Sequence, residues 1–288
     1  MDIESKKFLG QPKNFVSIFN ALLFDGQPVL KPEYLKDENS ELVMNVSSKH
    51  VDIIKRYEDG TYLDLFVIES QSYVDQCMVA RVMEYESVAR MRYIRQNFKK
   101  HVPMHTRLPM ILTVVLYVGE SKWNAAKRLS ELEIIHPGFE DMFNEFKLNL
   151  IELNTNHKYN TGEKATQDFF DLLRMIYRKQ ILKEDLDREF NRDALYFAYV
   201  VTKNKELLNI YQESEKGDVK VCRALDEMFE ESTNKGIQMG IKQGIEQGSE
   251  KKELEMYRKM MDKGFEIKTI ASIFSVSEES IKKLLMKA

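Results

Sequence analysis

The Asp59-Gly60 dipeptide constrains the fold more than any other feature of the sequence, because it separates two apolar runs at residues 49–57 and 61–70. A two-residue hairpin turn of type I′ needs positive φ at both central positions, and Asp-Gly is a pair that accepts this conformation. We therefore predict an antiparallel hairpin with this dipeptide as its turn. In that register the opposed pairs are His50 with Glu69, Asp52 with Val67, and Lys55 with Asp64.

Polar side chains gather at one end of the predicted hairpin. Because side chains alternate between the two faces of a strand, one face carries both apolar and polar residues, namely His50, Asp52, Ile54, Leu65, Val67, Glu69 and Gln71. Glu69 is the diagonal neighbour of Asp52, at about 7–8 Å between backbones, a gap that two carboxylates can close onto one metal ion. On an otherwise apolar strand, the charge of Glu69 is costly unless a metal or another cation compensates it. Asp64 lies on the other face. An ion pair with Lys55 explains its presence there more simply than a role in the site.

The remaining pattern predicts a mixed sheet flanked by helices. Apolar residues at helical spacing predict a first helix, which Asp25-Gly26 ends. An apolar run closed by Gly119 is long enough for a central strand that is buried on both faces. The order of the elements predicts an α/β fold. The predicted elements are helices over 13–24 and 75–98 and strands over 41–46, 108–118 and 146–153.

The C-terminal part of the chain is predicted to be helical. Residues 165–230 contain no proline and have apolar pairs at helical spacing. Glycine then recurs every four residues over 236–248, on nearly one face of a helix that each glycine weakens by about 1 kcal/mol relative to alanine. This stripe has two interpretations, an oligomer contact or a loosely formed connector. Residues 253–288 predict two short helices around Phe274-Ser-Val-Ser277, loosely like a helix-turn-helix. We predict three parts, namely a core domain over 1–160, a helical extension over 161–232 and a tail over 233–288.

Charge, cysteine content and hydropathy narrow the class of protein. The chain has 43 lysines and arginines against 46 aspartates and glutamates, a net charge of −3, so no overall positive field draws it to nucleic acid. The two cysteines lie far apart, form no metal-binding motif, and are predicted to be buried, reduced thiols. No apolar segment has the length of a membrane span, and the N-terminus lacks the apolar region of a secretory signal, so we expect no membrane partner and a cytoplasmic protein.

Several short segments, taken together, resemble one family of nucleases. They are Asn20–Gly26, Glu69-Ser-Gln-Ser72, the segment from Met78 through Arg81 to Tyr85, and the run from Leu108 to Tyr117 with Trp123 after it. In their order and spacing, these segments resemble the Rpn family of recombination-promoting nucleases and transposase-like proteins, which is part of the PD-(D/E)XK nuclease superfamily. The resemblance implies a restriction-endonuclease-like core, an α/β sheet flanked by helices, with an α-helical region after it.

The same resemblance implies a DNA endonuclease that depends on Mg²⁺ or Mn²⁺. Asp52 and Glu69 are then the metal ligands, and Gln71 completes the catalytic set. A metal ion held by two carboxylates lowers the pKa of a bound water and neutralises charge in the transition state. Gln71 departs from the superfamily motif, which has lysine there, because glutamine can orient a water molecule but supplies no charge. Arg81 has two interpretations of equal weight, contact with a substrate phosphate or support of Glu69.

DNA is the expected partner, and the basic segment 81–107 is the candidate contact. It has seven lysines and arginines against Glu84 and Glu86, so it can follow phosphates, or it can simply form a solvated helix face. The activity is expected to serve recombination, transposition or defence. A function of another class also fits the sequence: a catalytically impaired, nuclease-like protein that binds DNA or assembles into homo-oligomers through its C-terminal helices.

Overall fold

The computed structural model describes residues 3–37, 53–60, 63–98, 101–181, 185–214 and 217–286. The chain forms two compact units, Met1–Asp226 and Glu227–Ala288. His50, Asp52 and the predicted strand over 41–46 lie outside the described residues. The predicted division at residue 160 falls within the first unit and stays a prediction.

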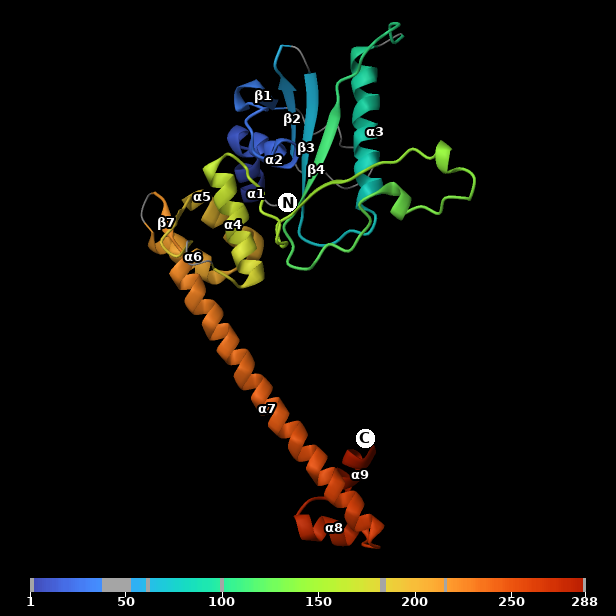
Figure 1. Ribbon diagram of the computed structural model, residues 1–288, viewed down its shortest axis with the longest axis vertical. Helices are drawn as coiled ribbons and strands as arrows, with labels where there is room; N and C mark the ends of the chain where they lie inside the picture. Colours follow the sequence, from blue (N-terminus) through green and yellow to red (C-terminus); the bar gives the residue numbers. More distant parts are fainter. Residues whose placement is uncertain are drawn as a thin grey trace. The chain divides into compact units, whose positions relative to one another are not determined.

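A mixed sheet forms the centre of the first unit (Figure 1). β2 runs antiparallel to both of its neighbours, β1 and β3, whereas β3, β4 and β5 are parallel to one another. This topology, with helices beside the sheet, confirms the predicted α/β class, and β4 is an interior strand as its apolar run predicts. The strands, in their order across the sheet, are β1 (Leu35–Asp37), β2 (Ile53–Glu58), β3 (Leu63–Gln71), β4 (Ile111–Tyr117) and β5 (Asn149–Glu152).

The hairpin of β2 and β3 forms, but the predicted register is wrong by two residues. Ile53 pairs with Ile68, and Ile54 pairs with Val67. Four residues, 59–62, connect the strands in place of a two-residue turn, and of the two that the structure describes only Gly60 has a positive φ, at 90°. Because the side-chain period of a strand is two, a two-residue shift leaves every side chain on its predicted face.

The two faces of the sheet are covered by different helices (Figure 1). On one face, α2 (Pro12–Phe24) places Phe19 against Phe66, with ring centroids 4.8 Å apart. On the other face lies α3 (Met78–Asn97). Glu69 and Gln71 alternate with Phe66 and so belong to the α3 side of the sheet. The buried cluster under α3 consists of Ile54, Leu65, Val67, Tyr85, Ala89 and Ile111.

α2 ends where the sequence predicts, because two consecutive residues leave the helical conformation. Asp25 has φ 51° and Gly26 has φ 77°, both in the left-handed region. A Cβ atom at position 26 would lie 2.6 Å from the side chain of Asn160, so both the backbone conformation and the close approach require glycine. At the other end, Pro12 begins the helix at a position whose backbone N–H has no partner within the helix.

The predicted ion pair between Lys55 and Asp64 is wrong. Lys55 lies opposite Phe66, and its ammonium contacts Asp37 on β1 at 2.6 Å. Asp64 accepts a hydrogen bond from the backbone N–H of Met110. The two-residue shift in register is the cause, since it moves Asp64 along the hairpin and away from Lys55.

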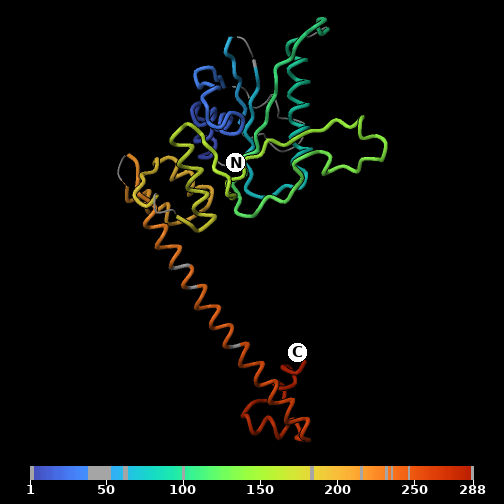
Figure 2. Tube along the Cα trace, viewed as in Figure 1, coloured from blue at the N-terminus to red at the C-terminus, as the bar shows by residue number. Residues whose placement is uncertain are grey.

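A long connection, residues 118–148, joins β4 to β5 and leaves the sheet before it returns (Figure 2). Trp123 anchors its first part, because the indole meets Tyr117 edge to face at 5.1 Å and donates its N–H to the carbonyl of Ala125. Trp123 thereby extends the apolar layer that also buries Met78 and Val115. The short 3-10 helices of the first unit are η1 (Pro32–Tyr34), η3 (Leu129–Glu131) and η4 (Glu140–Met142).

The helices that follow the sheet pack against the beginning of the chain. α1, which the sequence does not predict, places Phe8 against Phe169 and Phe197, with centroids 5.7 and 4.7 Å apart. Ser17 on α2 donates to Thr166 at 2.8 Å. The predicted helices over 165–230 are confirmed, and the part up to Asp226 belongs to the same unit as the sheet. The elements are α1 (Ile3–Leu9), α4 (Lys164–Arg178), α5 (Arg192–Thr202), α6 (Lys205–Glu213) and the antiparallel pair β6 (Glu189–Phe190) and β7 (Val219–Lys220).

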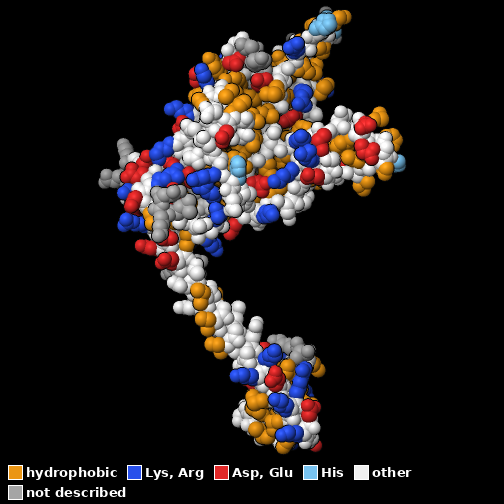
Figure 3. Space-filling view, in the orientation of Figure 1, with side chains coloured by type: hydrophobic (Ala, Val, Ile, Leu, Met, Phe, Trp, Pro, Cys, Tyr) orange, Lys and Arg blue, Asp and Glu red, His pale blue; other side chains and the backbone are white. Residues whose placement is uncertain are grey.

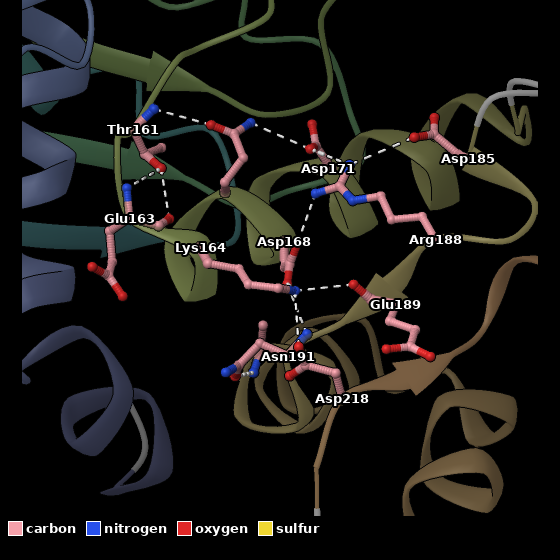
Figure 4. Close-up of polar contacts among 12 residues, drawn as sticks. Thr161, Glu163, Lys164, Asp168, Asp171, Asp185, Arg188, Glu189, Asn191 and Asp218 are labelled. Carbon is pink, nitrogen blue, oxygen red and sulfur yellow. Dashed lines mark hydrogen bonds and ion pairs between the residues drawn. The ribbon is translucent and has the colours of Figure 1, made fainter.

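Arg188 is the centre of a buried ionic network that ties α4 to the segment before β6 (Figure 4). Its guanidinium contacts Asp168 at 2.6 Å, Asp171 at 2.8 Å and Asp185 at 3.5 Å. Lys164 adds a second cation, which contacts Asp168 at 2.6 Å. Because buried carboxylates need cations and hydrogen bonds to offset the loss of water, this network explains how three aspartates are buried in a helical region.

The second unit is helical, as predicted. α7 (Cys222–Asp262) begins in the first unit, and α8 (Ile267–Phe274) and α9 (Glu278–Met286) are the two short helices expected around residues 274–277. The glycine repeat lies within α7, and a Cβ atom at any of its four glycines would meet no atom within 4 Å. No contact within the described chain therefore requires glycine there. Of the helices that the structure describes, none has both the length and the hydropathy needed to cross a bilayer.

The predicted burial of both cysteines is wrong for one of them. Cys222 is buried and Cys77 is exposed, and both are free thiols. Cys77 is exposed because it lies in the connection before α3, at the N-cap position of that helix. Burial raises the pKa of Cys222 to about 11, which keeps this thiol protonated at neutral pH.

Arg188→Leu is expected to lower the free energy of unfolding by about 3–5 kcal/mol, because it leaves buried carboxylates without their central cation. Urea denaturation followed by circular dichroism measures this loss. Arg223→Leu is the matched control, since the Arg223–Asp187 pair is 78% and 74% exposed and is worth at most about 1 kcal/mol. Equal losses in the two variants would contradict the role assigned to Arg188.

Candidate functional site

Glu69 is a buried carboxylate at the carboxyl end of β3. It is 3% exposed and lies opposite Val115 on the parallel strand β4. Val115 and Val67, which is two residues before Glu69 on the same face, belong to the two apolar clusters beneath α3. In such surroundings a carboxylate is stable only with compensating contacts, so the partners of Glu69 decide what it can do.

Gln71 and Arg81 hold the same oxygen of Glu69. Gln71, buried on the same face of β3, donates from Nε2 to Oε1 of Glu69 at 3.0 Å. Arg81, near the beginning of α3, donates from Nη2 to the same oxygen at 3.2 Å. The structure thus brings together Glu69, Gln71 and Arg81 from the predicted set, whereas Asp52 lies outside the described residues.

Arg81 is held by two further side chains. Its Nη1 pairs with Asp75, and its Nε and Nη2 donate to the hydroxyl of Tyr85 at 3.2 and 2.8 Å. Burial alone would lower the pKa of Arg81, but the hydrogen bonds to Asp75 and Tyr85 and the charge of Glu69 raise it above its ordinary value. The guanidinium is therefore a permanent cation. Burial raises the pKa of Tyr85, against the effect of Arg81, so the hydroxyl stays protonated at neutral pH.

Asp75 and Tyr85 belong to this site, although neither was predicted as a partner of Arg81. Tyr85 had a sequence signal, because it follows Arg81 by four residues and so lies on the same face of the helix. Asp75 had no such signal, because its position beside Arg81 is set by the path of the connection between β3 and α3. There its Oδ1 accepts a hydrogen bond from the backbone N–H of Cys77 at 2.9 Å, which fixes the carboxylate beside the beginning of α3.

The carboxylate of Glu69 is suited to be one of the ligands of a magnesium or manganese ion. A carboxylate oxygen is a hard ligand of the kind that both ions prefer. Within the described ranges, no group of three or more His, Cys, Asp or Glu side chains could hold a metal ion. A metal ion at Glu69 would therefore need further ligands, such as Asp52 or water molecules. The compensating charge that the sequence requires for Glu69 is supplied, in this structure, by Arg81.

The basic segment 81–107 is not a single positive surface. Arg81 and Arg90 are engaged by carboxylates, Arg90 with Glu86 at 3.2 Å. Arg107 precedes β4, whose first residue, Ile111, pairs with Leu65 on β3. Leu65 lies four residues before Glu69, which is about 13 Å along the strand. The exposed charge of Arg107 therefore lies toward the opposite end of the strands. Of the remaining cations, Arg95 is exposed and Lys99 and Lys100 lie outside the described residues.

The sequence model of a protein family matches this chain. This sequence model, described as "Putative transposase, YhgA-like", matches residues 33–207, which include the five strands of the central sheet, the cluster around Glu69 and the network around Arg188. No curated protein and no solved structure matches the chain. The match thus extends past the sheet into the helices that pack beside it.

Arg81→Gln is expected to lower the free energy of unfolding in EDTA by about 3 kcal/mol, because it removes a cation from the buried carboxylate of Glu69. Adding Glu69→Gln should recover part of this loss, since the double variant no longer buries that charge. Denaturant unfolding of the wild type, the two single variants and the double variant measures the coupling energy, which is expected to be at least about 1 kcal/mol. Strictly additive losses would argue against a direct ion pair.

Proposed function

Because the matching model covers more than half of the sequence, the chain belongs to the YhgA-like transposase family, and we propose that it is a metal-dependent DNA endonuclease. The observation that carries the proposal is the buried carboxylate of Glu69, held by Gln71 and Arg81 at the carboxyl end of β3. Ligand sites in sheets of this kind lie outside the carboxyl ends of parallel strands. The proposed role is in recombination, transposition or defence, in the cytoplasm.

Asp52 and Glu69 are the residues proposed to hold Mg²⁺ or Mn²⁺. Ile53, which follows Asp52 in the chain, pairs with Ile68, which precedes Glu69. This register supports the assignment of both carboxylates to one site. A bound divalent ion supplies a water of lowered pKa and neutralises charge on the phosphodiester in the transition state.

Gln71 stands where the superfamily motif has lysine, and Arg81 is proposed to supply the missing charge. The amide of Gln71 donates to Glu69, so it orients the carboxylate and leaves its own oxygen available to a water molecule. An amide has no useful basicity at neutral pH and cannot accept the proton of that water. Arg81 is permanently charged and lies next to Glu69 in the metal-free structure, so it is proposed to keep a positive charge near the ester that is cleaved.

DNA is the proposed substrate, and exposed arginines toward the far end of the sheet are proposed to hold it. Arg95 and Arg107 are exposed. Duplex DNA carries one negative charge per about 1.7 Å of its axis, so a duplex that runs from Glu69 toward that end of the sheet would bring phosphates near these arginines. Such contacts position a duplex without reading its sequence.

Purified protein is expected to nick or linearise supercoiled plasmid when Mg²⁺ or Mn²⁺ is added, and to lose this activity in EDTA. Glu69→Ala and Asp52→Ala should each reduce the rate by at least about 100-fold, because each removes a proposed ligand of the ion that stabilises the transition state. Glu133→Gln, which alters an exposed carboxylate in the connection between β4 and β5, is the control and should cleave like the wild type. Cleavage that persists in both alanine variants would refute the proposal.

A second candidate function is assembly through the tail, and α7 provides the observation that favours it. Ile237, Ile241 and Ile245 recur every four residues and are 55%, 58% and 67% exposed. Figure 3 shows hydrophobic side chains in a line along α7. Each isoleucine follows a glycine of the repeat, whose missing side chain leaves room for an approaching helix. Because exposed apolar stripes mark interaction surfaces, we propose that copies of the chain associate along α7.

Replacing Ile237, Ile241 and Ile245 together with glutamine is expected to lower the mass per particle measured by light scattering after size-exclusion chromatography. The apolar area that a second copy would bury is then lost. Ile273→Gln is the control, since this isoleucine is equally exposed but lies on α8. A wild-type chain that is monomeric at every concentration, or a triple variant with unchanged mass, would exclude association along α7.

A further inference from the structure

Arg81 is shared between two carboxylates, Glu69 at 3.2 Å and Asp75. We propose that Arg81 is the resident counter-ion of Glu69, that a divalent cation displaces it from this carboxylate, and that Asp75 and Tyr85 then retain it. The proposal rests on the proposed function, because it takes Glu69 as a metal ligand. It assigns Asp75 a role as a positioning residue, which acts on the metal site through Arg81.

Without a metal ion, the charge of Glu69 is compensated by Arg81. Glu69 is buried beneath α3, where an isolated carboxylate would be costly. The guanidinium allows it to stay at the end of β3 in the metal-free protein, with its Oε1 also fixed by Gln71. The ligand is therefore in place before the ion arrives, and the ion takes over from Arg81 as the compensating charge.

The contacts of Arg81 indicate which one is replaced. A divalent ion on the carboxylate of Glu69 would stand close to the guanidinium, and charges of the same sign repel each other. Nη2 of Arg81 donates to Tyr85 at 2.8 Å and to Glu69 at the longer distance of 3.2 Å. The bond to Tyr85 and the pair with Asp75 do not involve Glu69, so both can persist when the contact with Glu69 is lost.

Asp75 is suited to retain the displaced guanidinium. It belongs to the connection before α3 and not to the strand that carries Glu69. Its Oδ1 is fixed by the backbone N–H of Cys77 at 2.9 Å, and its Oδ2 faces Nη1 of Arg81. A fixed carboxylate on this side lowers the cost of moving the cation away from Glu69, because the cation keeps an anionic partner.

This arrangement predicts opposite shifts in metal affinity for two neighbouring residues. Arg81→Gln removes the cation that competes for Glu69 and is expected to tighten Mn²⁺ binding. We expect a change of about tenfold, which is the usual size when a group that contacts a metal ligand is altered. Asp75→Asn removes the anionic partner that lowers the cost of moving Arg81 away from Glu69. This variant is therefore expected to weaken Mn²⁺ binding about tenfold. If Asp75 acts through Arg81, adding Asp75→Asn to Arg81→Gln should change the affinity by less than about threefold.

The experiment is a titration of the full chain with Mn²⁺, in which electron paramagnetic resonance reports the free ion. Glu69→Ala defines the signal that belongs to the site. Asp37→Asn is the matched control, because Asp37 is also an aspartate paired with a cation, at 2.6 Å from Lys55, but on β1 at the edge of the sheet. It should bind Mn²⁺ like the wild type.

The outcomes separate this proposal from the proposed function. If the wild type binds no more Mn²⁺ than Glu69→Ala, Glu69 is not a metal ligand and the proposed function fails with it. If the wild type shows binding that depends on Glu69, but Arg81→Gln binds equally or more weakly, the exchange is overturned alone. Should Arg81→Gln not fold, Tyr85→Phe decides, because it removes only a hydroxyl that is proposed to retain Arg81 once the contact with Glu69 is lost. Weaker Mn²⁺ binding in Tyr85→Phe supports the exchange, and unchanged binding overturns it.

Discussion

The ion pair between Glu69 and Arg81 joins the last residues of β3 to the first turns of α3. The strand places a carboxylate within an apolar face, and the helix brings the cation that makes this burial tolerable. Asp75 and Tyr85 hold the same cation from the connection and from the next turn of the helix. One guanidinium therefore links α3, the connection before it and the carboxylate of Glu69.

Arg188 also compensates buried carboxylates, but its network is structural. Its partner Asp168 also accepts Lys164 at 2.6 Å and the backbone N–H of Asn191 at 2.7 Å, so this carboxylate is saturated by the protein itself. The network lies between α4 and the segment before β6 and stabilises their packing. Glu69 instead lies at the carboxyl ends of parallel strands, where sheets of this class present groups to ligands. Position in the fold, and not burial alone, distinguishes a candidate ligand from a structural carboxylate.

Alternation along the strands is sufficient to place Glu69 and Gln71 on one buried face, because the two-residue error in register preserves the face of every residue. The turn itself is not predictable from Asp59-Gly60, since the connection includes two further residues. The contacts of Arg81 with Glu69 and of Arg188 with Asp168 join segments 12 and 20 residues apart, which periodicity does not encode. The family match over residues 33–207 confirms the resemblance that short segments such as Met78–Tyr85 provide.

The central claim is that Glu69 is a ligand for a divalent cation, and that Arg81 compensates the charge of Glu69 when the ion is absent. Anomalous diffraction from crystals soaked in Mn²⁺ tests this most directly, because it locates the ion without reference to activity. The account predicts an anomalous peak about 2.1 Å from a carboxylate oxygen of Glu69, with the guanidinium of Arg81 shifted toward Asp75. An ordered Glu69 that keeps its contact with Arg81, with no peak beside it at saturating Mn²⁺, would contradict it.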